Sequence, residues 1–219
     1  TPKPSSAASD VYKRQLIDRE IPECQTDFVR CDDYQGGYLA GKHLLELGHR
    51  RFLYLPGPKY NLSQTRRYAG IMDALSEANV PVSNVRQIDY HTVFGSPVPS
   101  TSSYKSYEEL FFPVDYTAVI GFNDLQSYSA MEILKERGYR IPEDISLISF
   151  DHLRKTHTYL PPLTSIADNT DKSIADTAVS ILLDKIKNSD SKFTGAVLPV
   201  TIYDGHTTGP VNKAFETSF

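Results

Sequence analysis

The segment from Tyr116 to Ile166 restricts the possible folds more than any other part of the sequence. An apolar run ends in Asn123, a helical pattern follows near 124–137, and a second apolar run ends in Asp151. A strand, a helix and a second strand in this order predict a parallel pair joined by a crossover helix. Ligands of open α/β sheets bind at the edge where the strands have their carboxyl ends. We therefore expect Asn123 and Asp151 at a binding edge.

The alternation of strand and helix patterns extends from about residue 16 through most of the chain. Strands are expected near 15–20, 27–31, 51–55, 86–90, 117–122, 145–150 and 197–204. Helices are expected near 35–47, near 63–78 with Ser63 as the cap, and near 104–112, 124–137 and 171–187. This order predicts an α/β fold in which helices flank parallel sheets. The polar stretch 1–15 is expected to be a disordered or artefactual tail.

Composition excludes several classes of protein. The 219 residues are 40% hydrophobic and 23% charged, as in soluble globular proteins. A net charge of −4 argues against a chain that binds nucleic acid by itself. No apolar run approaches the roughly 18 to 20 residues that span a bilayer, and no signal pattern is present. Two cysteines, Cys24 and Cys31, are typical of a reduced cytoplasmic protein.

The known cofactor and catalytic motifs are missing from the sequence. The run Gly36–His43 nearly fits a phosphate loop, but its last position lacks the hydroxyl that binds magnesium. The same run has a helical pattern, and close packing of that helix on the sheet accounts for its glycines. No dinucleotide fingerprint, G-x-S-x-G elbow or metal-ligand histidine spacing occurs. We therefore expect no cofactor, no metal and no enzyme activity.

Three polar residues are left as candidates for ligand binding. Arg67 lies one turn into the helix after strand 51–55, where its guanidinium can reach the carboxyl edge and bind two ligand oxygens. Taken one at a time, the local patterns favour a solvated helix residue for Arg67 and a helix cap for Asn123, and Asp151 commonly caps a turn. Together they form a set that can hold a hydroxylated small molecule without catalysing a reaction.

The segments SQTRRYAGIMDAL, FND, PEDISLISFDH and PPLTSI lie in this order along the chain. Together they resemble the effector-binding domain of the LacI/GalR family of transcription regulators, and the resemblance covers residues 16–210. SQTRRYAGIMDAL is similar to the family segment in which an arginine clamps the effector, and Arg67 matches that arginine. FND resembles the strand end whose amide, here Asn123, contacts the effector. PEDISLISFDH is similar to the family signature whose first aspartate matches Asp151. PPLTSI resembles the segment in which the chain crosses between two lobes.

The sequence departs from the family pattern at several positions. His152 stands where the family has a second aspartate or asparagine, and Asp168 lies at or near the place of a ligand-facing glutamine. Asp18 matches a position that can face the cleft, and Asp32 can do the same. The region 91–103 does not match the usual aromatic-bearing loop, where Phe94 is a weak candidate for stacking on a sugar.

The resemblance implies a two-lobed fold of the periplasmic-binding-protein type with an incomplete first lobe. The first lobe is expected from 16–31 and 165–190, the second from 33–163 and 195–211, with 212–219 as a tail. The implied function is sensing of a sugar-like effector in a cytoplasmic, homodimeric regulator. DNA binding would reside in a head domain that this chain lacks. A soluble sugar-binding receptor of the same fold is the alternative.

Overall fold

The computed structural model describes residues 14–21, 23, 25–58, 60–88, 109–169, 173–188 and 193–217. Cys24, Phe94 and most of the helix expected near 104–112 lie outside these ranges. The chain divides into two compact units, each described separately below. Unit 1 contains the residues up to Asp32 and the segment Asp168–Val200, and unit 2 contains Asp33–Ala167 and the residues from Thr201 onward.

Unit 2 is built on a six-stranded sheet with the strand order β4-β3-β5-β6-β7-β9. The pairs β4-β3, β3-β5, β5-β6 and β6-β7 are all parallel. The strands are β3 Phe52–Leu55, β4 Val85–Gln87, β5 Ala118–Gly121, β6 Ser146–Phe150, β7 Thr164–Asp168 and β9 Val200–Tyr203. The helices of this unit are α1 Asp33–Glu46, α2 Leu62–Glu77, α5 Asp124–Glu136 and the short α7 Lys213–Glu216. Two 3-10 turns, η2 Val82–Asn84 and η3 Leu153–Lys155, connect them.

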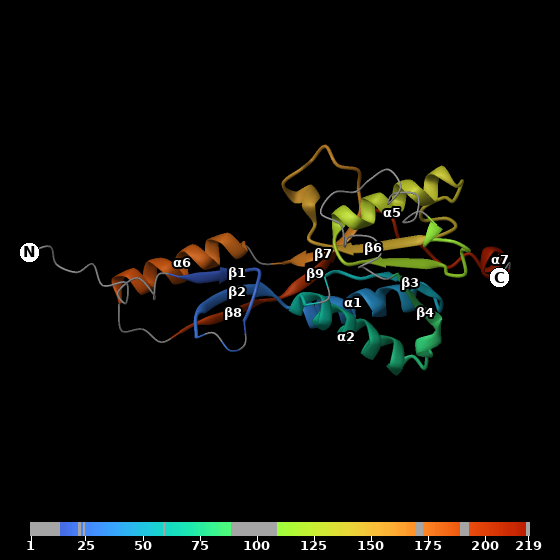
Figure 1. Ribbon diagram of the computed structural model, residues 1–219. Coiled ribbons are helices and arrows are strands. Elements are labelled where there is room, and N and C mark those ends of the chain that lie inside the picture. Colours follow the sequence, from blue (N-terminus) through green and yellow to red (C-terminus); the bar gives the residue numbers. More distant parts are fainter. Residues whose placement is uncertain are drawn as a thin grey trace, which may run out of the picture. The chain divides into compact units, whose positions relative to one another are not determined.

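Helices cover both faces of this sheet, with α5 on one face and α1 and α2 on the other (Figure 1). Strands β3, β5 and β6 are buried at every position, as the continuous apolar runs of the sequence require. Leu53, Val119 and Leu147 pack in one core cluster with Ile133 and Leu134 of α5. Because side chains alternate along a strand, the neighbouring residues on β3, β5 and β6 point toward α1 and α2.

Small residues let α1 and α2 approach each other closely. A Cβ atom added to Gly37 would lie 2.0 Å from the carbonyl oxygen of Arg67, and one added to Gly70 would lie 2.1 Å from that of Tyr34. The near phosphate-loop motif is therefore helical, as predicted. The packing explanation needs a correction, because Gly37 and Gly41 of this motif face α2 and not the sheet.

His49 joins several elements at the amino edge of the sheet. Its Nε2 donates to the carbonyl oxygen of Gly209 at 3.0 Å, since a carbonyl can only accept. Its Nδ1 lies 2.9 Å from the hydroxyl of Thr117, and Nε2 lies 3.0 Å from that of Ser146. Desolvation by burial lowers the pKa of His49 from 6.5 to about 4. The folded protein therefore holds this imidazole in its neutral form.

We expect the stability of unit 2 to fall as the pH is lowered from about 6.5 toward about 4. In that window the unfolded chain protonates His49 while the folded chain excludes the proton, so protonation favours unfolding. The loss is roughly 3 kcal/mol at the acid end. Urea unfolding at a series of pH values would measure it. In His49→Gln this part of the pH dependence should be absent, whereas His157→Gln, at an exposed histidine, should retain it.

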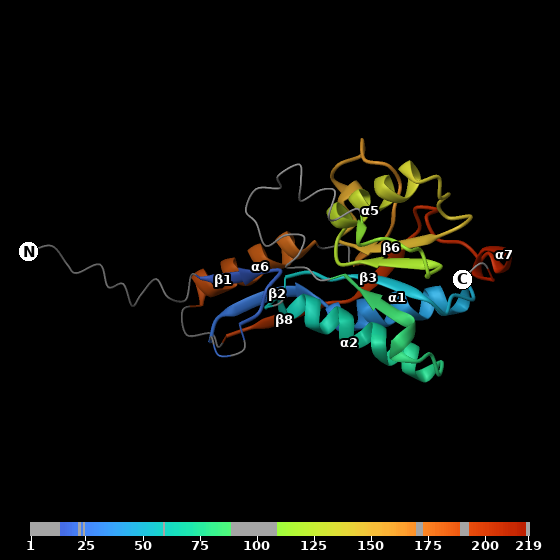
Figure 2. The same ribbon diagram turned by 45° about the vertical axis from the view of Figure 1, so that its right-hand side comes forward.

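Unit 1 contains a three-stranded parallel sheet with the order β1-β2-β8, and α6 lies along it (Figure 2). Its elements are β1 Gln15–Ile17, β2 Asp27–Cys31, β8 Gly195–Leu198 and α6 Ile174–Lys187. Ser173 forms a capping box with Asp176, which fixes the start of α6. A buried ion pair joins Lys185 of α6 to Asp27 of β2, with Nζ 3.1 Å from Oδ1.

The structure corrects three expectations about segment boundaries. The expected strand 197–204 is two strands, and β8 pairs with β2 in unit 1, so residues 195–200 belong to unit 1 and not to the second lobe. The segment 164–167 pairs with β6 and belongs to unit 2. The cap of α2 is Asn61, whose side chain accepts from the backbone N–H groups of Ser63 and Gln64, so Ser63 is not the cap.

Candidate functional site

The carboxyl edge of the six-stranded sheet brings together residues from α1, α2, β5 and β6. Arg67 is on the second turn of α2 and its side chain is only 7% exposed. Its guanidinium lies over the rings of Phe122 and Phe150, which follow β5 and end β6, at 5.0 and 4.5 Å from the ring centroids. The two rings hold the planar cation in a mostly apolar setting, where its hydrogen bonds are shielded from water.

Each nitrogen of the Arg67 guanidinium donates to a protein oxygen. Nε donates to Oδ1 of Asp33 at 2.9 Å, and Nη1 donates to the carbonyl oxygen of Phe122 at 2.6 Å. Nη2 lies 3.4 Å from Oδ1 of Asp151, which makes this the longest of the three contacts. Arg67 is therefore a buried structural centre of this edge as well as a candidate ligand contact. The interpretation of Arg67 as a solvated helix residue is wrong.

Asp33 is a member of this group that the sequence analysis did not single out. It is the first residue of α1, and its side chain is 2% exposed. Its Oδ2 is buried and has no hydrogen-bond partner within the described ranges. The sequence signal was an acidic residue in the first turn of the helix that follows strand 27–31, a position that the helix dipole favours. The residue predicted to face the cleft was its neighbour, Asp32.

Asn123 lies two positions after the last residue of β5 and caps α5. Its side-chain oxygen accepts from the backbone N–H of Gln126 at 2.9 Å, so the capping interpretation of this residue is correct. The amide nitrogen forms no hydrogen bond within the described part of the chain. Capping occupies the oxygen alone and is compatible with a ligand contact through the nitrogen. The role of Asn123 in ligand binding stays a prediction.

Asp151 and His152 form a turn directly after β6 in which both residues have positive φ, 95° and 48°. Such backbone is uncommon for residues other than glycine and typically costs about 1–3 kcal/mol per residue. The Asp151 side chain is 38% exposed, so it is the most accessible of the three charged groups at this edge. Desolvation raises the pKa of Asp151, the nearby Arg67 opposes this, and Asp33 adds to it. The carboxylate is therefore both accessible and close to a second carboxylate.

A polar clasp formed by Asp124 and Ser165 stabilises this strained turn. Asp124 is buried at the start of α5, and its Oδ2 accepts from the backbone N–H of Leu153 at 2.7 Å. Its Oδ1 accepts from the Ser165 hydroxyl at 2.7 Å, and that hydroxyl accepts from the backbone N–H of His152 at 2.9 Å. Both N–H groups after Asp151 are thereby fixed, which holds its carboxylate beside Arg67.

Asp124→Asn is expected to loosen the turn, because one carboxylate oxygen becomes an amide that cannot accept from its present donor. We expect a loss of about 1–3 kcal/mol in unfolding free energy. Hydrogen exchange at the amides of His152 and Leu153 should accelerate more than exchange at the core strands. Ser146→Ala removes a buried hydroxyl from the other end of β6 and provides the matched control. Equal effects of the two variants on these amides would contradict the clasp.

The other two predicted site residues belong to unit 1. Asp18 follows β1 with a φ of 56°, is exposed, and donates its backbone N–H to the carbonyl oxygen of Val29. Asp168 is the last residue of β7 and the first residue of the segment assigned to unit 1. The structure thus groups Arg67 with Asp151 and Asp33 within unit 2. The roles of Asp18 and Asp168 stay predictions from the sequence.

Other kinds of site have little support in the described ranges. No group of three or more histidine, cysteine or acidic side chains there is arranged to hold a metal ion. Within the same ranges, no helix has the length and apolar character needed to cross a membrane.

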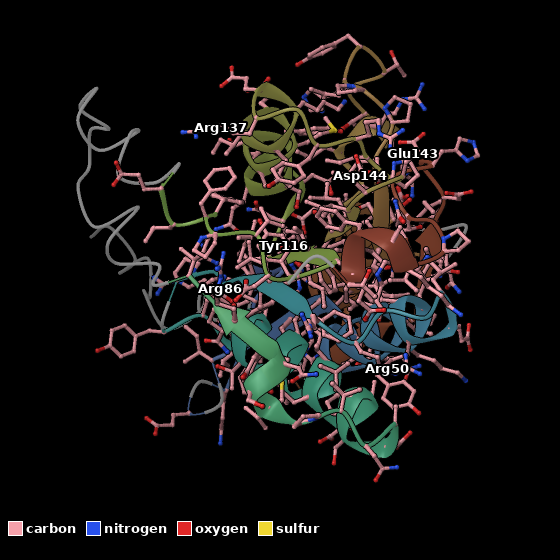
Figure 3. All side chains as sticks on the ribbon, turned by 90° about the vertical axis from the view of Figure 1, so that its right-hand side faces the viewer. Arg50, Arg86, Tyr116, Arg137, Glu143 and Asp144 are labelled. Atoms are coloured by element: carbon pink, nitrogen blue, oxygen red, sulfur yellow. The ribbon has the colours of Figure 1, made fainter. Side chains whose placement is uncertain are left out.

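A cavity of about 300 Å³ lies at the opposite, amino edge of the unit 2 sheet, and Arg86 is one of the polar residues that line it. The Arg86 guanidinium donates to the carbonyl oxygens of Leu110, Phe111 and Pro113 and pairs with Asp115. It also lies 5.1 Å from the ring centroid of Tyr116. The labelled Arg86 and Tyr116 side chains are neighbours in Figure 3. These contacts hold the turn before β5, so Arg86 has a structural role.

Comparison with known proteins agrees with this geometry. The sequence matches the periplasmic binding protein-like domain family over residues 42–208. It is 32% identical over 168 residues to the HTH-type transcriptional repressor PurR of Mannheimia succiniciproducens, which covers 76% of this chain and 48% of that protein. The chain spans about half the length of the curated relatives it matches.

Solved structures of LacI family transcriptional regulators superpose well on this chain. The LacI family transcriptional regulator from Enterococcus faecium with bound ribose has a TM-score of 0.75 and 28% identity, covering 90% of this chain and 71% of that one. The LacI family transcriptional regulator from Enterococcus faecalis V583 with bound ribose has a TM-score of 0.72 and 26% identity, covering 90% and 69%.

The parallel sheets, the flanking helices and the polar group at a carboxyl edge define an α/β ligand-binding domain. The chain belongs to the periplasmic binding protein-like domain family. Among proteins with this domain it resembles the effector-binding part of LacI/GalR regulators, and the resemblance found in its sequence motifs is confirmed.

Proposed function

We propose that this chain is the effector-sensing part of a LacI/GalR-type transcription regulator and that its effector is a sugar-like small molecule. The observation that carries the proposal is the polar group at the carboxyl edge of the unit 2 sheet. There Arg67, buried between two phenyl rings, is hydrogen-bonded to Asp33 and Asp151. An accessible carboxylate beside a fixed guanidinium and aromatic rings is well suited to hold hydroxyl groups above an apolar floor.

Binding is the role that these groups favour over catalysis. The accessible members are a carboxylate, Asp151, and an amide, Asn123, and the Arg67 guanidinium is engaged by protein oxygens. A hydrolytic or transfer mechanism would need a nucleophile beside a base, and this group contains none. The similar proteins are regulators, which also supports a function without catalysis.

The partners that we propose are an effector, a second copy of the chain, and DNA bound through a head domain elsewhere in the protein. Regulation then requires the effector to bind one arrangement of the protein more tightly than another. The cytoplasm is the compartment that such a function requires. Light scattering on the complete gene product would test the homodimer, with twice the mass of one chain as the expected result.

A soluble sugar-binding receptor is the alternative from another class. The similarity to repressors favours the regulator. Sequencing the coding region upstream of this segment separates the two proposals. A helix-turn-helix is expected there, and a signal peptide would contradict the regulator and support the receptor.

A further inference from the structure

The cavity at the amino edge of the unit 2 sheet has a surplus of positive charge. Its wall consists of two arginines, one carboxylate and three uncharged residues, namely Arg51, Arg86, Asp115, Phe52, Ser83 and Asn84. Two guanidinium groups against one carboxylate leave an excess of one positive charge within this wall. The volume of about 300 Å³ is at the lower end of the range for small-molecule sites. The cavity is therefore large enough for a small anion and has the charge that attracts one.

The strand register brings the two arginines of the wall to the same side of the sheet. In the parallel pair of β3 and β4, Leu53 lies beside Arg86, and Arg51 stands two positions before Leu53. Because side chains alternate along a strand, Arg51 and Arg86 belong to the same face. The backbone of Arg51 is also fixed, since its carbonyl oxygen accepts the N–H of Thr117 at 3.0 Å. Both arginine side chains therefore start from well-defined positions beside the cavity.

Arg86 has a fixed guanidinium whose only charged partner in the wall is half exposed. The carbonyl oxygens of Leu110, Phe111 and Pro113 accept from its Nη atoms and hold the group in place. The compensating charge comes from Asp115, whose Oδ1 lies 2.9 Å from Nη1 and whose side chain is 52% exposed. An ion pair this open to water contributes at most about 1 kcal/mol. A dissolved anion can therefore replace the Asp115 carboxylate at small cost.

We infer that this cavity binds a small oxyanion, which is a phosphate or carboxylate group. The guanidinium groups of Arg51 and Arg86 are planar forks, a shape that matches both kinds of group. Neutral donors complete the wall. They are the Ser83 hydroxyl and the second N–H of the Asn84 amide, whose first N–H donates to the carbonyl oxygen of Arg50 at 2.9 Å. The site lies at the opposite edge of the sheet from the proposed effector site and does not depend on the proposed function.

Calorimetric titration with inorganic phosphate and with succinate tests the inference. We would use the complete gene product in chloride buffer, at constant ionic strength and at a mildly alkaline pH where both anions are doubly charged. At least one of them is expected to bind with a Kd of about 1 mM or tighter. The anion that binds more tightly identifies the preferred group. Failure of both to bind would overturn the inference, whatever sugar binding the same protein shows.

Two substitutions with opposite expected effects test whether the anion occupies this cavity. Arg51→Gln removes one positive charge and leaves the contacts of Arg86 in place, so binding should weaken about tenfold or more. Asp115→Asn removes the competing carboxylate and should tighten binding about tenfold. Arg140→Gln, at an arginine that is 66% exposed and outside the wall, removes the same charge as Arg51→Gln and should leave the affinity unchanged. Unchanged affinity in Arg51→Gln, or weaker binding in Asp115→Asn, would overturn the inference.

Discussion

Arg67→Ala is expected to have the largest effect of any single substitution on both binding and stability. The buried Asp33 carboxylate would lose its ionic partner, and an uncompensated buried charge typically costs about 3–5 kcal/mol. The Asp151 turn would also lose the contact that orients its carboxylate. We expect sugar affinity to fall at least about 100-fold. Chemical denaturation and calorimetry on the same preparation would measure the two effects separately.

Arg66→Ala is the natural control, because it removes the same kind of side chain from the adjacent position of α2. Arg66 is only partly buried, and its substitution should cost about 1 kcal/mol or less. Arg66 and Arg67 are adjacent in the sequence, and the structure places the Arg67 side chain at the edge. If the two variants lost stability and affinity equally, the central position of Arg67 would be refuted.

Gly37→Ala should have the second-largest effect. The added Cβ would lie 2.0 Å from the Arg67 carbonyl oxygen, a backbone atom that cannot rotate away. Helices α1 and α2 would have to separate, and Asp33 on α1 would move with respect to Arg67 on α2. We expect a loss of about 3 kcal/mol or more, which exceeds the gain of about 1 kcal/mol in helix propensity. Thermal unfolding together with sugar titration would report both consequences.

Gly41→Ala provides a graded comparison in the same helix. Its added Cβ would lie 3.0 Å from the Ala74 Cβ and 3.2 Å from the Ile71 carbonyl oxygen, contacts that small shifts relieve. Its net effect should stay within about 1 kcal/mol. A Gly37→Ala protein as stable as Gly41→Ala would contradict the close approach of the two helices.

The strands and helices of unit 2 could be predicted because local patterns dictate them. The strands at 51–55 and 145–150 are buried on both faces of the sheet, so their sequences are continuously apolar and easy to recognise as strands. Strand 197–204 was misread because two strands follow one another with only Pro199 between them. Proline has no N–H group for a strand ladder, and this one stands where the chain leaves one sheet for another.

The site could be predicted only in part, because several of its contacts join residues that are far apart in the sequence. The positions of Asn123 and Asp151 follow from the strand ends, which are local. Asp33 lies 34 positions from Arg67, and only the close packing of α1 on α2 brings the two side chains together. The clasp on the Asp151 turn likewise depends on Asp124 and Ser165 meeting across 41 positions. Contacts of this range are set by tertiary packing, which no local pattern specifies.

Calorimetric titration of the wild-type and Asp151→Ala proteins with D-ribose and D-glucose tests the central claim most directly. Asp151 is accessible enough that its truncation should leave the fold intact, so a change in affinity reports on the site itself. If the effector binds at the carboxyl edge of unit 2, a sugar should bind the wild type, and Asp151→Ala should weaken that binding about 100-fold or more. Unchanged affinity in the variant would show that the ligand binds elsewhere.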